Sequence, residues 1–138
     1  MMTVTRAAFV AEARTWIGTP YRHQGRLKGI GADCIGLVIG VAREVGLFDL
    51  DVGGYDKRPD GTLQMRVEQY TTPKGFDEVQ PGDLLLFHWD GTPTHVGILS
   101  EPLHLIHAFA VNRKVVEHRL DERWLAQVVG AYQIPGVL

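Results

Sequence analysis

Residues 31–38 read Gly-Ala-Asp-Cys-Ile-Gly-Leu-Val and contain the single cysteine of the chain, Cys34. A loop with three glycines, residues 22–32, precedes the cysteine, and a nearly unbroken apolar run follows it. This change of pattern predicts a helix over residues 34–45 that is apolar enough to be buried on most sides. Asp33 is a residue type that caps helix N-termini. Cys34 is therefore expected in the first turn of a buried helix.

A thiol in the first turn of a helix is a candidate nucleophile. The free N–H groups and the dipole of a helix start stabilise a thiolate, and a neighbouring imidazolium stabilises it further. A lone buried cysteine is, however, more often a small core residue than a nucleophile. The assignment therefore depends on a histidine that the fold brings to Cys34.

Two further segments before residue 80 have helical patterns. In residues 5–17 the apolar side chains recur on one helical face, and Gly18 and Pro20 end the helix. Gly36 and Gly40, four residues apart, leave a bare strip on the cysteine helix where another backbone could approach closely. Residues 47–78 are the least regular region, with a short helix suggested by Leu63, Val67 and Tyr70, and they are expected to wall a cleft.

From residue 80 the pattern is that of β-strands. Strands are predicted at residues 84–87, 94–99, 103–109, 114–119 and 128–134, and Asp121 is expected to cap a helical turn that contains Trp124. Helices come first and a meander of antiparallel strands second, which is typical of the α+β class. With 138 residues the chain is long enough for one core, so residues 1–138 are expected to form a single domain.

Composition excludes several classes of function. The net charge of −2 and the scattered lysines and arginines provide no footprint for nucleic acid. One cysteine cannot form an internal disulfide. The longest apolar run, residues 35–42, is far shorter than the ~20 residues of a membrane span. No signal peptide is recognised in residues 1–14, so we expect synthesis in the cytoplasm.

Strand geometry narrows the choice among the six histidines: His23, His88, His95, His104, His107 and His118. If the connection between the two strands is centred on Glu101, His95 and His107 stand directly opposite each other on one face. One imidazole could then pair with the thiol while the other orients the first imidazole, as in acyl-transfer triads. His104 lies an odd number of residues from His107, so its side chain would point to the other face of the sheet. If the turn is instead centred on Glu101–Pro102, the pairing slips by one residue and fails without a bulge.

Other uses of these side chains stay open. Two histidines on adjacent strands are more often structural residues than catalytic ones. A zinc site made of Cys34, His95 and His107 is conceivable. Because none of the common metal-binding spacings is present, neither a metal nor another cofactor is expected.

Five short motifs, taken in order, resemble the NlpC/P60 family of cysteine peptidases. They are residues 18–21 (Gly-Thr-Pro-Tyr), 33–38 (Asp-Cys-Ile-Gly-Leu-Val), 81–85 (Pro-Gly-Asp-Leu-Leu), 94–98 (Thr-His-Val-Gly-Ile) and 106–108 (Ile-His-Ala). The resemblance implies a papain-like α+β fold, in which N-terminal helices, including the one that bears the cysteine, pack on a small antiparallel sheet. It also implies hydrolysis of cell-wall peptides, commonly at the bond between γ-D-glutamate and a diamino acid such as meso-diaminopimelate or lysine.

The resemblance also assigns roles to individual residues. Cys34 is similar to the family nucleophile, His95 to its base, and His107 to the polar residue that orients the base. Tyr21 matches a tyrosine that could donate its hydroxyl to the oxyanion or to substrate. Asp33 matches an aspartate beside the nucleophile, which could cap the helix or hold a substrate amine.

Ile35 departs from the pattern, because most bacterial members have serine after the cysteine. In having isoleucine at this position, the chain resembles the subgroup encoded by phages and prophages, often beside tail genes. It implies a phage tail protein as partner and delivery to the periplasm or cell wall by the tail. An amidase or acyltransferase of the same fold, or a non-catalytic tail or wall-binding module, are the alternatives.

Overall fold

The computed structural model describes residues 2–47, 62–89 and 91–138. Helices dominate the first half of the described chain and strands the second; the exceptions are a short hairpin in the loop before the cysteine and a short helix before the last strand. The elements in order are α1 (Arg6–Arg14), β1 (Arg26–Leu27), β2 (Gly31–Ala32), α2 (Cys34–Glu44), α3 (Thr62–Tyr70), β3 (Thr72–Lys74), β4 (Leu84–Trp89), β5 (Thr92–Glu101), β6 (His104–Phe109), β7 (Lys114–Arg119), α4 (Glu122–Leu125) and β8 (Val128–Gln133), with single 3₁₀ turns at Phe76–Glu78 and Ala110–Asn112.

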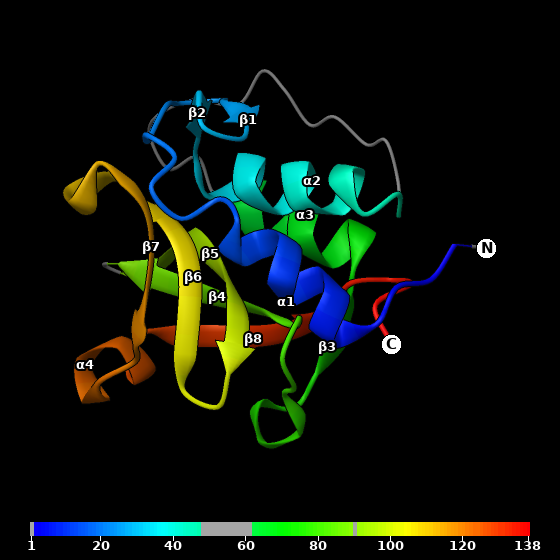
Figure 1. Ribbon diagram of the computed structural model, residues 1–138. Helices are drawn as coiled ribbons and strands as arrows, with labels where there is room; N and C mark the ends of the chain where they lie inside the picture. The colour runs from blue at the N-terminus through cyan, green and yellow to red at the C-terminus, as the bar shows by residue number, and fades with distance from the viewer. Residues whose placement is uncertain (1, 48–61, 90) are drawn as a thin grey trace.

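The strands β3 to β8 form one six-stranded sheet in the order β3-β8-β4-β5-β6-β7. Every neighbouring pair is antiparallel. Helices α1, α2 and α3 lie together over one face of this sheet, and α4 lies apart from them beside β7 (Figure 1). The predicted α+β architecture is confirmed. None of the helices in the described part of the chain is long and apolar enough to cross a membrane.

Helix α2 is the central helix of the fold. It begins at Cys34, as predicted, and its side chains Leu37, Val41 and Ala42 are fully buried between α1 and the sheet. Asp33 is the N-cap residue, and Gly46, with a φ of 80°, follows the end of the helix. A buried helix with a fixed first turn holds the thiol at one position relative to the sheet.

The bare strip on α2 is occupied by close neighbours. A Cβ at Gly36 would overlap the backbone carbonyl of Gly25, and a Cβ at Gly40 would overlap the indole of Trp16. The first contact fixes the loop before the hairpin against the start of α2, and the second packs the turn after α1 against the middle of α2. The predicted close approach of another backbone is confirmed at Gly36, whereas Gly40 faces the side-chain ring of Trp16.

Some boundaries differ from the sequence predictions. Helix α1 ends at Arg14, so Ile17 lies beyond it and is 45% exposed instead of sharing the buried face. Residues 15–18 form turns, and Gly18 has a φ of 92°, which closes them. Strand β3 was not predicted; Pro73 lies within it, at the sheet edge, where a missing N–H costs no pairing.

The irregular region predicted at residues 47–78 is only partly described. Residues 48–61 lie outside the described residues, and α3 confirms the short helix suggested by its apolar spacing. Helix α3 does wall a pocket, as reported below.

Candidate active site

Cys34 lies at the first position of α2 and is half-buried. Burial raises the pKa of its thiol to about 12, and the charge of Asp33 acts in the same direction. The backbone N–H groups of Val96, Ile35 and Cys34 itself approach the sulfur and act against this rise in pKa. The thiol is therefore protonated near neutral pH, with donors in place for negative charge that develops there.

Tyr21 places its phenol close to the same thiol. Burial raises the pKa of Tyr21 to about 12, and the charges of Cys34 and Asp33 add to this. The backbone N–H of Tyr21 donates to the carbonyl of Arg113 at 2.8 Å, which ties the tyrosine to the turn before β7. The phenol keeps its proton and is available as a donor beside the nucleophile.

Asp33 is a buried helix cap, 2% exposed. Its Oδ1 accepts from the N–H of Gly36 at 2.8 Å, and its Oδ2 accepts from the N–H of Gln24 at 2.7 Å. His23 Nδ1 lies 3.9 Å from the same Oδ2. The capping role is confirmed, whereas the role in holding a substrate amine stays a prediction.

The pairing predicted between His95 and His107 is wrong in register but right in face. Strand β5 turns into β6 so that Glu101 pairs with His104, and a bulge then shifts the pairing to Leu99 with Leu105. This register places the two histidines diagonally instead of directly opposite. A two-residue turn alone would have placed the two side chains on opposite faces of the sheet. The extra residue of the bulge shifts the register by one, so both side chains lie on one face.

Three histidines form a continuous chain on this face. His95 Nε2 lies 2.6 Å from His107 Nδ1, and His107 Nε2 lies 2.8 Å from His118 Nε2. His118 Nδ1 lies 2.9 Å from the carbonyl oxygen of Arg119. His95 is 6% exposed and His107 is fully buried. His107 thus contacts the ring nitrogen of His95 that is expected to face away from the thiol.

Aromatic rings enclose the chain. The indole of Trp124, on α4, packs against all three imidazoles, with ring centroids 6.2, 5.1 and 5.3 Å from His95, His107 and His118. Phe109 stacks on His107 and meets His95 edge-on. These rings exclude water from the first two histidines.

Cys34 contacts the strand of His95 through a backbone group and not through the imidazole. The N–H that approaches the sulfur belongs to Val96, the residue that follows His95. No hydrogen bond joins Cys34 Sγ to His95 in the described residues, so the direct contact that we expected is not formed here. Nucleophile–base hydrogen bonds often tighten only in the complex with substrate.

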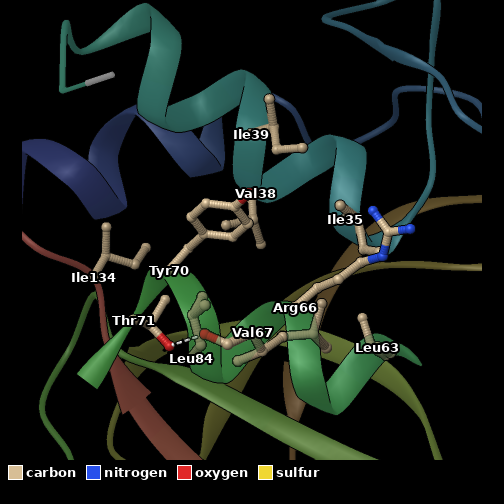
Figure 2. A pocket seen from close by; sticks show the side chains of 11 residues that line it. Ile35, Val38, Ile39, Leu63, Arg66, Val67, Tyr70, Thr71, Leu84 and Ile134 are labelled. Carbon is tan, nitrogen blue, oxygen red and sulfur yellow. Dashed lines mark hydrogen bonds between the residues drawn. The ribbon is translucent and has the colours of Figure 1, made fainter. Parts of the chain in front are cut away.

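An apolar pocket begins next to the nucleophile and runs between α2 and α3. Figure 2 shows Ile35 and Val38 of α2 facing α3 across it, with Arg66 reaching from α3 toward Ile35. The cavity volume is about 70 Å³, and Val96 contributes to its lining. A chain bound at Cys34 could extend into this pocket past Ile35.

The comparisons with known proteins agree with this fold. The NlpC/P60 family model matches residues 18–132. The chain belongs to the NlpC/P60 family. This is a family of cysteine peptidases, and the α+β fold described above is the one that the resemblance implied.

Individual NlpC/P60 relatives show how far the similarity extends. A probable endopeptidase of Corynebacterium glutamicum is 34% identical over 117 residues, which are 85% of this chain and 49% of the relative. The chain thus spans about half the length of that relative. The NlpC/P60 domain of the peptidoglycan hydrolase SagA is 30% identical, with a TM-score of 0.70 over 95% of this chain and 100% of that domain. An NlpC/P60 protein of Bacillus cereus shares the fold at 22% identity, with a TM-score of 0.74 over 96% of this chain and 41% of that one.

His118 is the member of the histidine chain that sequence reasoning missed. Strand β7 pairs His107 with Val116, so His118 is diagonal to His107 on the same face. Alternation along residues 114–119 could have revealed this, because positions 116 and 118 share a face. Trp124 was predicted only as part of a helical turn, and its packing on the histidines depends on how α4 folds back.

The buried histidines predict a loss of stability in mild acid. Burial, together with a charge on His118, lowers the pKa of His95 to about 3; burial and charges on His95 and His118 lower that of His107 to about 2. An unfolded histidine titrates near ~6.5, so the unfolded chain takes up protons below that pH while these two side chains stay neutral. The contribution of the two neutral histidines to the free energy of unfolding is therefore fully present above pH ~6.5. Below that pH, each histidine lowers the free energy of unfolding by about 1.4 kcal/mol per pH unit.

Urea unfolding between about pH 8 and about pH 5 measures this slope. His107→Gln should reduce the slope, because one of the two buried imidazoles is gone. His104→Gln, at a partly exposed histidine on the same strand, should leave it unchanged. Equal slopes in all three proteins would contradict the assignment.

Proposed function

We propose that this chain is a cysteine endopeptidase that cleaves the γ-D-glutamyl–diamino acid bond of peptidoglycan stem peptides. The observation that carries the proposal is the placement of Cys34 at the start of a buried helix, next to the strand that holds His95, whose ring contacts His107, in a chain of the NlpC/P60 family. The description of SagA as a peptidoglycan hydrolase supports the choice of substrate.

The proposed mechanism uses neutral groups at the start. His95 accepts the thiol proton at Nδ1 as the sulfur of Cys34 attacks the amide carbonyl, since burial disfavours a preformed thiolate–imidazolium pair. The N–H groups at the start of α2, with the phenol of Tyr21, stabilise the oxyanion. His95 then protonates the departing amine of the diamino acid. Water, deprotonated by His95, attacks the thioester and releases the γ-glutamyl carboxylate and the free thiol.

Digestion of purified muropeptides tests the proposed reaction. The wild-type protein should release a diamino acid-containing fragment from tripeptide or tetrapeptide stems, with meso-diaminopimelate and lysine stems assayed in parallel. Binding without cleavage would instead support a wall-binding module. Reaction only with small amides or acyl donors would support an amidase or acyltransferase. Intact stems in the presence of folded, reduced protein would contradict the proposal.

We further propose that the protein acts as part of a phage tail, which would carry it from the cytoplasm to the periplasm or wall. The proposal rests on Ile35, which stands where most bacterial members have serine. Mass spectrometry of purified particles from a prophage-bearing producer strain tests it. The protein should co-purify with tails through a density gradient. Recovery only from the cytosol of induced cells would contradict the tail assignment.

A further inference from the structure

His118 lies at the outer end of the histidine chain, where its own partner can only accept a hydrogen bond. Its Nδ1 is 2.9 Å from the carbonyl oxygen of Arg119, so Nδ1 must carry the proton. In neutral His118 the other nitrogen, Nε2, is then an acceptor. The backbone of β7 thus sets the tautomer of this side chain.

The tautomer propagates inward through the two short contacts. Because His118 Nε2 accepts, His107 must donate from Nε2 across 2.8 Å, which leaves its Nδ1 without a proton. His107 Nδ1 therefore accepts from His95 Nε2–H across 2.6 Å. His95 is left with an unprotonated Nδ1, which is the form that can take a proton from a thiol.

We propose that His118 is a positioning residue that sets the tautomers of His107 and His95 and so keeps His95 ready to act as a base. The proposal rests on the proposed function for its role in catalysis, but the tautomer order follows from the three contacts alone. His118 touches neither the nucleophile nor the reacting atoms. It acts through His107 over two hydrogen bonds.

Protonation of His118 reverses the order. With both nitrogens protonated, His118 donates to His107 Nε2, so the proton of His107 moves to Nδ1 and points at His95. His95 must then accept at Nε2 and carry its proton on Nδ1, where it can no longer act as a base. The chain is thus a switch that disables the base in acid without protonating His95.

The side chains packed against His118 come from β6 and α4. The titratable groups that face it in the described residues are His107 on β6 and, beyond that, His95 on β5. From α4 the packed residue is the uncharged Trp124, and the charged residues there, Asp121, Glu122 and Arg123, are exposed. On β7 itself, Glu117 and Arg119 alternate to the other face, and Glu117 pairs with Arg14 at 3.0 Å.

Three substitutions separate the acceptor role from a merely structural one. His118→Gln keeps an acceptor oxygen that cannot be protonated, and it should retain about a third or more of the wild-type kcat near neutral pH. His118→Leu removes the acceptor, and kcat should fall about tenfold, the value of one hydrogen bond. His118→Lys can only donate, and kcat should fall about a hundredfold with KM unchanged. His104→Gln is the control at a histidine outside the chain.

Two measurements test the positioning role of His118: the pH profile of the reaction and the tautomers of the histidine rings. The acid limb of kcat/KM should move by about one pH unit or more to lower pH in His118→Gln, measured where circular dichroism shows a folded protein. Nitrogen-15 spectra of the histidine rings should show protons on Nε2 of His95 and of His107 in wild type, and a mixture of tautomers in His118→Leu. This spectrum is independent of turnover, so it tests the relay even if no substrate is cleaved. A proton on His95 Nδ1 in wild type, or unchanged tautomers and kcat in the folded leucine variant, would overturn the proposal.

Discussion

Replacing Cys34 with alanine should abolish muropeptide hydrolysis, with kcat/KM lower by about 10⁴-fold or more. The thioester cannot form without the sulfur, and no other described nucleophile lies at the start of α2, where the backbone donors converge. The measurement is the release of the diamino acid-containing fragment, followed by chromatography under reducing conditions.

The alanine variant should remain folded, which makes its loss of activity interpretable. Cys34 is half-buried and its side chain is small, so the free energy of unfolding should change by less than about 1 kcal/mol. Muropeptide affinity should also persist, because Tyr21 and the pocket beside Ile35 are unaltered. Residual cleavage near the wild-type rate by Cys34→Ala would rule out Cys34 as the nucleophile.

The sequence predicted the element that carries the nucleophile because its signals are local. The N-terminal boundary of α2, its cap at Asp33 and the end signal at Gly46 all follow from residue types within a few positions of each other. The packing of another backbone against Gly36 was also predictable, because four-residue spacing places both glycines on one side of a helix. The partner of that surface, Gly25, was not, because its carbonyl arrives through a loop of irregular conformation.

The sheet shows where local reasoning ends. Strands β4 to β8 were predicted from apolar patterns within a few residues of their observed limits, but register depends on the turn and on bulges. The bulge between Leu99 and Glu101 has no strong sequence signal, yet it keeps His95 and His107 on the same face. The diagonal arrangement of His107 and His118 likewise needed the register of the next pair of strands.

Motif resemblance supplied what geometry could not. Physical reasoning alone left His95 and His107 open to structural and metal-binding interpretations, and the ordered motifs favoured the peptidase. The resemblance named a triad, whereas the structure adds a third histidine and a backbone carbonyl behind it. The added members are polar groups outside the short motifs, so the resemblance did not name them.

Replacing Gly36 with alanine should both destabilise the protein and impair catalysis. The new methyl group would overlap the backbone carbonyl of Gly25, which cannot rotate away as a side chain can. Overpacking of this kind costs about 1–3 kcal/mol and sometimes more, against less than about 1 kcal/mol gained from the better helix propensity of alanine. We expect a net loss of about 2 kcal/mol in urea unfolding.

Catalysis should suffer because relief of the overlap displaces the loop that Gly25 belongs to. The N–H of Gln24 donates to Asp33 Oδ2, and the N–H of Asp33 donates to the carbonyl of Gly25 at 3.2 Å, so a shift of this loop disturbs the cap beneath Cys34. Gly40→Ala is the matched control: it lies on the same helix and its methyl group would meet the Trp16 ring, far along α2 from the thiol. Both variants should lose stability, but only Gly36→Ala should lose kcat by about tenfold or more when assayed at a temperature where both are folded. Equal kcat in the two variants would show that the Gly25 contact serves packing alone and does not hold the nucleophile in place.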